Sequence, residues 1–297
     1  MRGFFSKLLA YVVLQVVAMT AWPIDVQDYL AISGPNPQAT FAYGTAPSQK
    51  VEFFHPEGRG PFPVAILIHG GCWLTRYGGL AQFRMLAAAL ARQGVATWNI
   101  EYRRVDEAGG GYPGTYRDIA AAVDLLADKA PQLDLDLQRI VAVGHSAGAQ
   151  LALWAAARAR LPESSALFEP TPLHIPTVIS VGGLPDLQGN ASTISRSCRI
   201  DPTSLTGAPT NARPDVFADT SPAALLPDGV DTIGINGSRD TIAPPAIAQA
   251  FKALARASGD RARTSVVEGA DHLDEATTTS PVWPVLDADI LDALMAR

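Results

Sequence analysis

Cysteine is scarce in this chain, which has only Cys72 and Cys198 among its 297 residues. Two cysteines exclude a fold that is held together by several disulfides. One bridge between them is possible in an oxidising compartment, but Cys72 lies in a glycine-rich motif whose backbone needs an unusual geometry. We therefore expect two unpaired thiols.

Charge is also sparse, since charged residues make up 18% of the chain and the formal net charge is −6. The sequence has no run of Lys or Arg that could form a basic stripe, so nucleic acid is not an expected partner. Hydrophobic residues account for 47% of the chain, which is enough for a large buried core. These proportions favour a folded protein whose partner is a small molecule.

A membrane span needs about 20 consecutive apolar residues, and the apolar run from Leu8 to Trp22 is shorter than that. It follows Arg2 and Lys7, and a basic start before a short apolar stretch is typical of a secretory signal peptide. We expect residues 1–21 to be a signal peptide, which implies a secreted or periplasmic protein with no stable membrane partner after cleavage. The alternative is an N-terminal segment that is retained as a membrane anchor.

From Lys50 onward, short runs rich in Val and Ile alternate with longer stretches rich in Ala and Leu. This alternation predicts an α/β fold with a mostly parallel central sheet and helices on both faces. The expected strands cover residues 51–54, 63–68, 95–101, 139–143, 177–181, 232–236 and 264–267. The expected helices cover residues 80–93, 115–130, 147–160, 245–258 and 285–295. We expect a single domain over residues 22–297.

Two segments depart from this alternation. Residues 24–49 contain several Pro and Gly residues and show weak periodicity, so we expect a connecting segment without a functional role. Residues 182–220 are rich in Gly, Pro, Ser and Thr and are too polar for a core element. Ordinary connections are far shorter, so we expect an insertion that acts as a functional loop or lid, with a mobile surface excursion as the alternative.

The strongest motif is Gly144-His145-Ser146-Ala147-Gly148, between the expected strand 139–143 and an Ala-rich helix. In a strand, turn and helix context, Gly-x-Ser-x-Gly is typical of a nucleophile elbow. The small flanking residues let the chain turn tightly, and the helix N-terminus offers partial positive charge to a developing oxyanion. The motif predicts Ser146 as a nucleophile and the N–H of Ala147 as an oxyanion donor.

A serine nucleophile needs a base that is held by a third group. In this arrangement the acid follows the serine along the chain and the histidine comes last. Asp240 follows the expected strand 232–236, and His272 follows the expected strand 264–267. We predict Asp240 as the acid and His272 as the base; the alternatives are a turn or helix-cap aspartate and a surface histidine.

A second glycine-rich motif, His69-Gly70-Gly71-Cys72-Trp73, follows the expected strand 63–68. Acyl transfer needs donors aimed at the carbonyl oxygen, and glycine lets the backbone turn its N–H groups inward. We predict Gly71 and Cys72 as oxyanion donors beside Ala147, and His69 as a brace of the loop.

Two further residues are candidates for substrate binding. Trp73 either packs under the glycine-rich loop or lines the acyl pocket, and His145 adjoins the nucleophile. The sequence contains neither a His-Glu-x-x-His motif nor a Gly-x-Gly-x-x-Gly motif at the first helix. We therefore expect no metal and no dinucleotide cofactor.

The two motifs together resemble the esterase branch of the α/β-hydrolases that includes kynurenine formamidase-like, hormone-sensitive-lipase-related and BD-FAE-like carboxylesterases. The stretch 99–118, with Glu101-Tyr102-Arg103-Arg104 and Tyr112-Pro113-Gly114, is also similar to that branch. Hormone-sensitive-lipase relatives usually have a third glycine where Cys72 stands and an aspartate where His145 stands. The sequence therefore resembles the formamidase-like side more closely.

This resemblance implies an α/β-hydrolase fold and a serine esterase. The expected reaction is hydrolysis of small to medium acyl or aryl esters through an acyl-enzyme on Ser146, with a small-molecule ester as the partner and no cofactor. Two alternatives remain open at this point: an arylformamidase-type amidase, and a non-catalytic binding protein with an α/β-hydrolase fold.

Overall fold

The computed structural model describes residues 24–295, and the expected signal peptide over residues 1–21 lies outside them. Its strands are β1 (Ala39–Ala42), β2 (Lys50–Phe54), β3 (Phe62–Ile68), β4 (Ala96–Ile100), β5 (Leu135–His145), β6 (Thr177–Val181), β7 (Asp231–Gly237) and β8 (Ala262–Val267). Its helices are α1 (Val26–Ala31), α2 (Arg84–Ala91), α3 (Gly114–Leu133), α4 (Ala147–Ala157), α5 (Ala191–Cys198), α6 (Thr203–Thr206), α7 (Pro245–Ala257) and α8 (Trp283–Met295).

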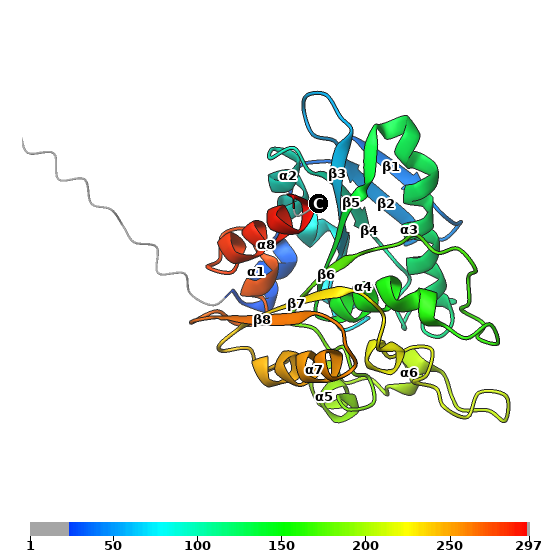
Figure 1. Ribbon diagram of the computed structural model, residues 1–297. Helices are drawn as coiled ribbons and strands as arrows, with labels where there is room; N and C mark the ends of the chain where they lie inside the picture. Colours follow the sequence, from blue (N-terminus) through cyan, green and yellow to red (C-terminus); the bar gives the residue numbers. More distant parts are fainter. Residues whose placement is uncertain (1–23, 296–297) are drawn as a thin grey trace, which may run out of the picture.

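The strands form a single sheet in the order β1-β2-β4-β3-β5-β6-β7-β8 (Figure 1). The strands from β4 to β8 in this order all pair in parallel, whereas β1 pairs antiparallel with β2 and β2 pairs antiparallel with β4. The predicted mostly parallel sheet is confirmed. All seven expected strands are present, and their ends differ from the expectation by a few residues.

Helices cover both faces of the sheet. Helices α3, α4 and α7 lie on one face, and α1, α2 and α8 lie on the other (Figure 1). One core cluster joins the sheet to the first group of helices, and a second joins it to the other group. The side chains of neighbouring residues in β3 alternate between them, since Ile66 belongs to the first cluster and Leu67 to the second. A strand that is buried on both faces reads as a continuous apolar run, which is why β3 and β6 were visible in the sequence.

The segment 24–49 contains two elements that the sequence did not predict. β1 extends the sheet beyond β2, and α1 begins after Asp25, whose side chain accepts a hydrogen bond from the N–H of Asp28 at 2.8 Å. Both elements are too short to show a periodic pattern. The expectation of a plain connecting segment is wrong.

The insertion over residues 182–220 is also more ordered than its composition suggested. It contains α5 and α6, and four of its apolar side chains are fully buried in the first core cluster: Leu184, Leu187, Ile194 and Leu205. Arg213 ties the segment together through Asp219 and the carbonyl of Thr206, at 2.7 Å from the latter. The expectation that the insertion is too polar to contribute to the core is wrong, because these side chains are spaced among polar ones.

Parallel strands bring their carboxyl ends to one edge of the sheet, where ligands of open α/β folds bind. The loops after β3, β5, β7 and β8 all lie at this edge and carry the candidate residues. Within residues 24–295, no helix has both the length and the apolar composition of a membrane span.

Candidate active site

Ser146 lies at the sharp turn between β5 and α4, with φ 53° and ψ −118°. A non-glycine residue in such a conformation costs about 1–3 kcal/mol, and the turn is held by a hydrogen bond from the N–H of Ser146 to the carbonyl of Val181 at 2.8 Å. A Cβ on Gly148 would lie 2.1 Å from the carbonyl oxygen of Ile68. The elbow therefore needs its glycine because α4 packs directly against the end of β3.

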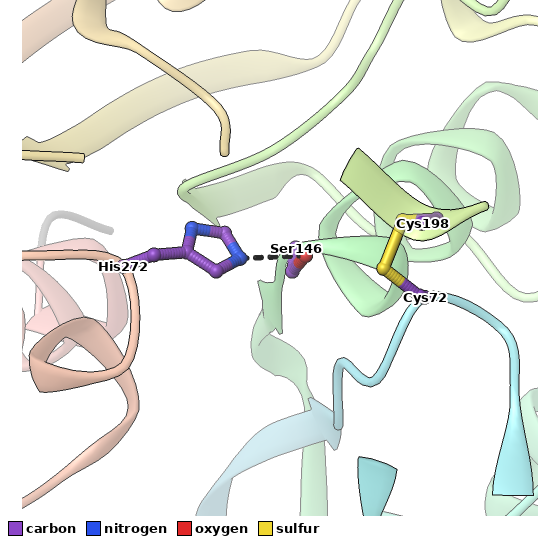
Figure 2. Close-up of a disulfide and its surroundings, with 4 residues drawn as sticks. All are labelled: Cys72, Ser146, Cys198 and His272. Atoms are coloured by element: carbon purple, nitrogen blue, oxygen red, sulfur yellow. Dashed lines mark hydrogen bonds between the residues drawn. A yellow bond between two sulfur atoms is a disulfide. The ribbon is translucent and has the colours of Figure 1, made fainter. Parts of the chain in front are cut away.

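The three side chains that the motifs single out meet at this edge. His272 Nε2 is 2.8 Å from Ser146 Oγ (Figure 2). On the other side of the ring, His272 Nδ1 is 2.8 Å from Asp240 Oδ2. All three residues are buried. A proton on Nδ1 is donated to the carboxylate, which leaves Nε2 free to accept the proton of the serine hydroxyl.

Asp240 is held for this contact by its own loop. Its second oxygen, Oδ1, accepts hydrogen bonds from the N–H groups of Ile242 and Ala243, both at 2.8 Å. Burial tends to raise the pKa of Asp240, but the contact with His272 and these two N–H groups outweigh burial and lower it. The carboxylate is therefore ionised. One of its oxygens is fixed by the turn, and the other contacts His272.

The glycine-rich loop after β3 passes against the nucleophile. Gly71, Cys72 and Trp73 have φ values of 107°, 53° and 55°, and a Cβ on Gly70 would lie 3.1 Å from Ser146 Cβ. Within residues 24–295, the N–H groups of Gly71, Cys72 and Ala147 donate to no protein acceptor. The predicted donors are thus unengaged beside Ser146.

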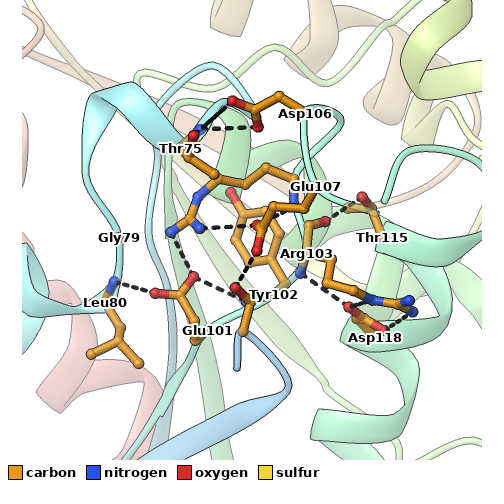
Figure 3. A network of polar contacts seen from close by, with 12 residues as sticks. Thr75, Gly79, Leu80, Glu101, Tyr102, Arg103, Asp106, Glu107, Thr115 and Asp118 are labelled. Atoms are coloured by element: carbon orange, nitrogen blue, oxygen red, sulfur yellow. Dashed lines mark hydrogen bonds and ion pairs between the residues drawn. The ribbon is translucent and has the colours of Figure 1, made fainter. Parts of the chain in front are cut away.

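A polar frame lies behind this loop. His69 Nε2 is 2.8 Å from Glu101 Oε1, and Glu101 also accepts a hydrogen bond from Arg104 Nη2 at 2.7 Å. Glu101 accepts a further hydrogen bond from the N–H of Leu80 at 3.2 Å (Figure 3). Burial alone would raise the pKa of Glu101, but His69, Arg104 and the N–H of Leu80 lower it to about 2. Figure 3 shows the frame continuing to Arg103 and Asp118, which pair at 2.7 Å. These contacts hold His69 in place under the loop.

Cys72 and Cys198 form a disulfide with a Cα–Cα distance of 5.3 Å, so the expectation of two free thiols is wrong (Figure 2). The bridge connects the glycine-rich loop to the last residue of α5. The unusual backbone of the loop does not prevent pairing. The left-handed conformation of Cys72 instead coexists with the bridge, because the insertion brings Cys198 to the loop.

A cavity of about 180 Å³ opens beside Ser146. It is lined by Val26, Tyr29, Leu30, Gly71, Cys72, Tyr77, His145, Ser146, Ser197, Ile242, His272 and Leu273. No Asp, Glu, Lys or Arg is among them. Three of its lining residues come from α1, in the segment that was expected to have no functional role. A larger groove of about 730 Å³ lies at the opposite ends of β6 to β8, away from these residues.

The two candidate substrate-binding residues have different positions. Trp73 is fully buried in the core and does not line the cavity, so of the two positions left open by the sequence the structure favours the one under the loop and not the one in substrate binding. His145 does line the cavity, and its Nε2 is 2.8 Å from the carbonyl oxygen of His272. Burial and the neighbouring His272 lower the pKa of His145 to about 3, so its imidazole is neutral.

Sequence reasoning missed one ionisable residue at the site. Glu275 is 1% exposed, and its Oε2 lies 3.6 Å from His272 Nδ1 and 3.9 Å from His145 Nε2. These three residues are also the group whose potential metal-ligand atoms lie within 4.8 Å of one another in the described part of the chain. Both ring nitrogens of His272 and the Nε2 of His145 already contact protein oxygens, so these atoms are engaged within the protein. The only sign of Glu275 in the sequence is its position three residues after His272.

Comparison with solved structures shows the α/β-hydrolase fold. A truncated carbohydrate esterase from gut microbiota is 20% identical with a TM-score of 0.71, over 88% of this chain and 99% of that one. Esterase B from Lactobacillus rhamnosis, inhibited by a tributyrin phosphonate, is 21% identical with a TM-score of 0.73, over 89% and 87%. A propionate-bound thermophilic esterase from Thermogutta terrifontis is 19% identical with a TM-score of 0.65, over 86% and 93%.

At the level of sequence, the model of the BD-FAE family matches residues 52–254. This range includes the glycine-rich loop, the elbow and Asp240, and it ends before His272. No curated protein matches the chain.

Proposed function

Since the chain belongs to the BD-FAE family, we propose that it is a serine hydrolase that cleaves carboxylic esters with small to medium acyl or aryl groups. The observation that carries this proposal is the chain of two 2.8 Å contacts from Ser146 through His272 to Asp240. Unengaged backbone donors lie beside it. An unactivated hydroxyl is a poor nucleophile at neutral pH, and this arrangement supplies what it lacks.

In the proposed first step, Ser146 Oγ attacks the ester carbonyl while His272 Nε2 takes the hydroxyl proton. The carbonyl oxygen becomes negative and is bound by the N–H groups of Gly71, Cys72 and Ala147. Donors that are already oriented towards the developing charge lower the barrier because they need no reorganisation. The bond to the alcohol breaks as His272 returns the proton to the leaving oxygen, and an acyl-enzyme remains.

In the second step, water attacks the acyl-enzyme. His272 takes a proton from the water, Ser146 is released with that proton, and the carboxylic acid leaves. Asp240 holds the imidazole in the required tautomer and stabilises the imidazolium that forms in both steps. No cofactor takes part in this scheme.

The lining of the cavity supports a neutral, largely apolar substrate. Val26, Leu30, Ile242 and Leu273 contribute apolar surface, and no charged acid or base among the lining residues would pair with a substrate charge. Propionate and a tributyrin phosphonate, which the solved esterases bind, have short carbon chains, and this is in line with a cavity of about 180 Å³.

We also propose that the protein is exported and acts as a secreted or periplasmic enzyme after loss of residues 1–21. The basic start and short apolar run of the sequence support this, as does the disulfide, because such bridges persist in oxidising compartments. Mass spectrometry of the N-terminus of the secreted protein tests it. A mature chain that begins near Trp22 supports export, whereas a protein that stays in the cytoplasm with Met1 contradicts it.

Hydrolysis of p-nitrophenyl acetate and butyrate, compared with hydrolysis of N-formylkynurenine, tests the proposed reaction. We expect turnover of both esters, little or none of the formamide, and loss of ester turnover in Ser146→Ala. Preference for the formamide would favour an amidase instead. Labelling by a fluorophosphonate probe that disappears in Ser146→Ala separates a catalyst from a binding protein, and an unlabelled wild type would contradict the proposal.

A further inference from the structure

Glu275 occupies a site that is built for a carboxyl group. It lies in the 3₁₀ turn Asp274–Ala276, and its Oε1 accepts a hydrogen bond from the N–H of Gly237, the last residue of β7, at 2.5 Å. A Cβ on Gly182, which follows β6 with φ 54°, would lie 2.0 Å from Glu275 Oε2. The carboxyl therefore fits only because glycine stands at position 182.

The groups that face this carboxyl are two histidines and two further acids. His272 and His145 lie 3.6 Å and 3.9 Å from Oε2, and Asp240 and Asp271 act on it electrostatically. Oε2 has no donor partner among the described residues, although it is buried. A buried carboxylate oxygen without a donor is costly, whereas the protonated oxygen of a carboxylic acid becomes a donor itself and satisfies the same position.

The electrostatics agree with this geometry. Burial, together with the nearby charge of Asp240, raises the pKa of Glu275 well above its ordinary value. Asp240 has two backbone donors and His272, and its pKa is lowered. Two carboxyl groups side by side do not both ionise readily, and their surroundings decide which one keeps the proton. Here Asp240 is the ionised member of the pair.

We propose that Glu275 is a positioning residue of this site: a neutral carboxylic acid that donates a hydrogen bond to Asp240 and acts on Ser146 through Asp240 and His272. This role rests on the proposed function, because it concerns the base of the same reaction. An ionised Glu275 would place a second negative charge 3.6 Å from His272 Nδ1. Such a charge favours the imidazolium and removes the base at neutral pH. The neutral acid avoids this and fixes the orientation of the Asp240 carboxylate.

Two substitutions test the proposal, with kcat/KM for p-nitrophenyl butyrate measured against pH. Glu275→Gln retains an acceptor for the N–H of Gly237 and a donor for Asp240, so we expect kcat/KM within about threefold of wild type. The acidic limb of the profile, which is the pH range over which kcat/KM falls on acidification, should not move. Glu275→Met removes both groups at similar volume, and we expect kcat/KM to fall by about tenfold or more, mainly in kcat. Glu52→Gln is the control, since Glu52 is a buried carboxylate paired with Arg84 outside the cavity lining. It should leave the acidic limb unmoved.

An acidic limb that moves down by about one pH unit or more in Glu275→Gln would overturn the proposal, because it would mean that the wild-type group is ionised. Wild-type kcat/KM in Glu275→Met would also overturn it. Melting curves accompany both variants, and Glu275→Ala replaces the Met variant if that protein does not fold. A wild-type protein that hydrolyses no ester would instead contradict the proposed function, so the two failures are distinguishable.

Discussion

The reacting groups and the walls of the cavity come from two different kinds of sequence. Ser146, Asp240 and His272 lie in loops that follow strands of the parallel sheet, so a short motif and a strand place each of them. Part of the wall comes from α1 and from the end of α5, which lie in the two irregular segments, while Tyr77, Ile242 and Leu273 come from the loops after β3, β7 and β8. The chemistry is therefore encoded locally, whereas the shape of the cavity depends on contacts between distant parts of the chain.

The two regions are also held differently. The reacting groups are anchored by the sheet and by paired hydrogen bonds such as those from Ile242 and Ala243 to Asp240. α1 is attached through longer contacts, for example from Gln82 Nε2 to the carbonyl of Leu30 at 3.3 Å, and α5 is attached by the disulfide. Changes to the reacting groups should abolish turnover, and changes to the walls should alter stability or substrate preference.

The largest effect is expected for Asp240→Asn, which tests the region of the reacting groups. The amide no longer favours the Nδ1-protonated tautomer of His272, so kcat should fall by roughly 10⁴-fold. The hydrogen bonds from Ile242 and Ala243 can remain, so the melting temperature should change little. Steady-state kinetics with p-nitrophenyl butyrate measure the loss. A variant with more than a tenth of wild-type kcat would show that Asp240 does not hold the base.

Cys198→Ser tests how far the wall depends on the disulfide. The bridge closes a loop with a sequence separation of 126, so its loss should lower the free energy of unfolding by about 5 kcal/mol. Urea unfolding with and without a reducing agent provides the measurement. Reduction should destabilise the wild type by a similar amount and leave the variant unchanged. Equal stability of the two proteins without reductant would mean that the bridge does not constrain the chain.

Glu101→Gln tests the frame behind the glycine-rich loop. The pKa of Glu101 is lowered from 4.5 to about 2, so its ionised form stabilises the fold above pH 4.5, and this contribution is lost as the pH falls through 2. The variant should lose about 3 kcal/mol of stability at neutral pH and show a flatter decline in acid. Denaturant unfolding at several pH values checks this, with the exposed Glu57→Gln as a control. Parallel curves for wild type and Glu101→Gln would contradict it.

The smallest effect is expected at the outer wall, where Leu30→Trp on α1 narrows the cavity. The ratio of kcat/KM for p-nitrophenyl butyrate to that for the acetate should fall by about tenfold, since one or two methylene groups in an apolar pocket are worth about 1–3 kcal/mol. Leu254→Trp on α7 is a matched control, because Leu254 is also exposed and does not line the cavity. An unchanged ratio in Leu30→Trp would mean that α1 does not contact the acyl chain.

The contrast between the two regions also explains what could be predicted from the sequence. Continuous apolar runs such as β3 identified the sheet, and strand-end motifs singled out Ser146, Asp240 and His272, because both signals depend on neighbours in the chain. The same reasoning missed α1, whose six residues carry no period. It also left open whether Trp73 packs under the glycine-rich loop or lines the cavity, and the side chain is fully buried.

Long-range contacts account for the other errors. The pairing of Cys72 with Cys198 depends on how the insertion folds back onto the glycine-rich loop. The residues next to each cysteine in the sequence do not indicate this. Glu275 lies close to His272 in the chain, but its burial is set by Gly182, which follows β6, and by Gly237 at the end of β7. Properties that arise where several elements meet leave no pattern within any one of them.

A crystal structure of the protein after reaction with a butyl phosphonate ester tests the proposed chemistry most directly. We expect phosphorus to be bonded to Ser146 Oγ, with the phosphonyl oxygen within hydrogen-bonding distance of the N–H of Ala147 and of Gly71 or Cys72. An adduct on another residue, or a phosphonyl oxygen that points away from these N–H groups, would contradict the proposed site.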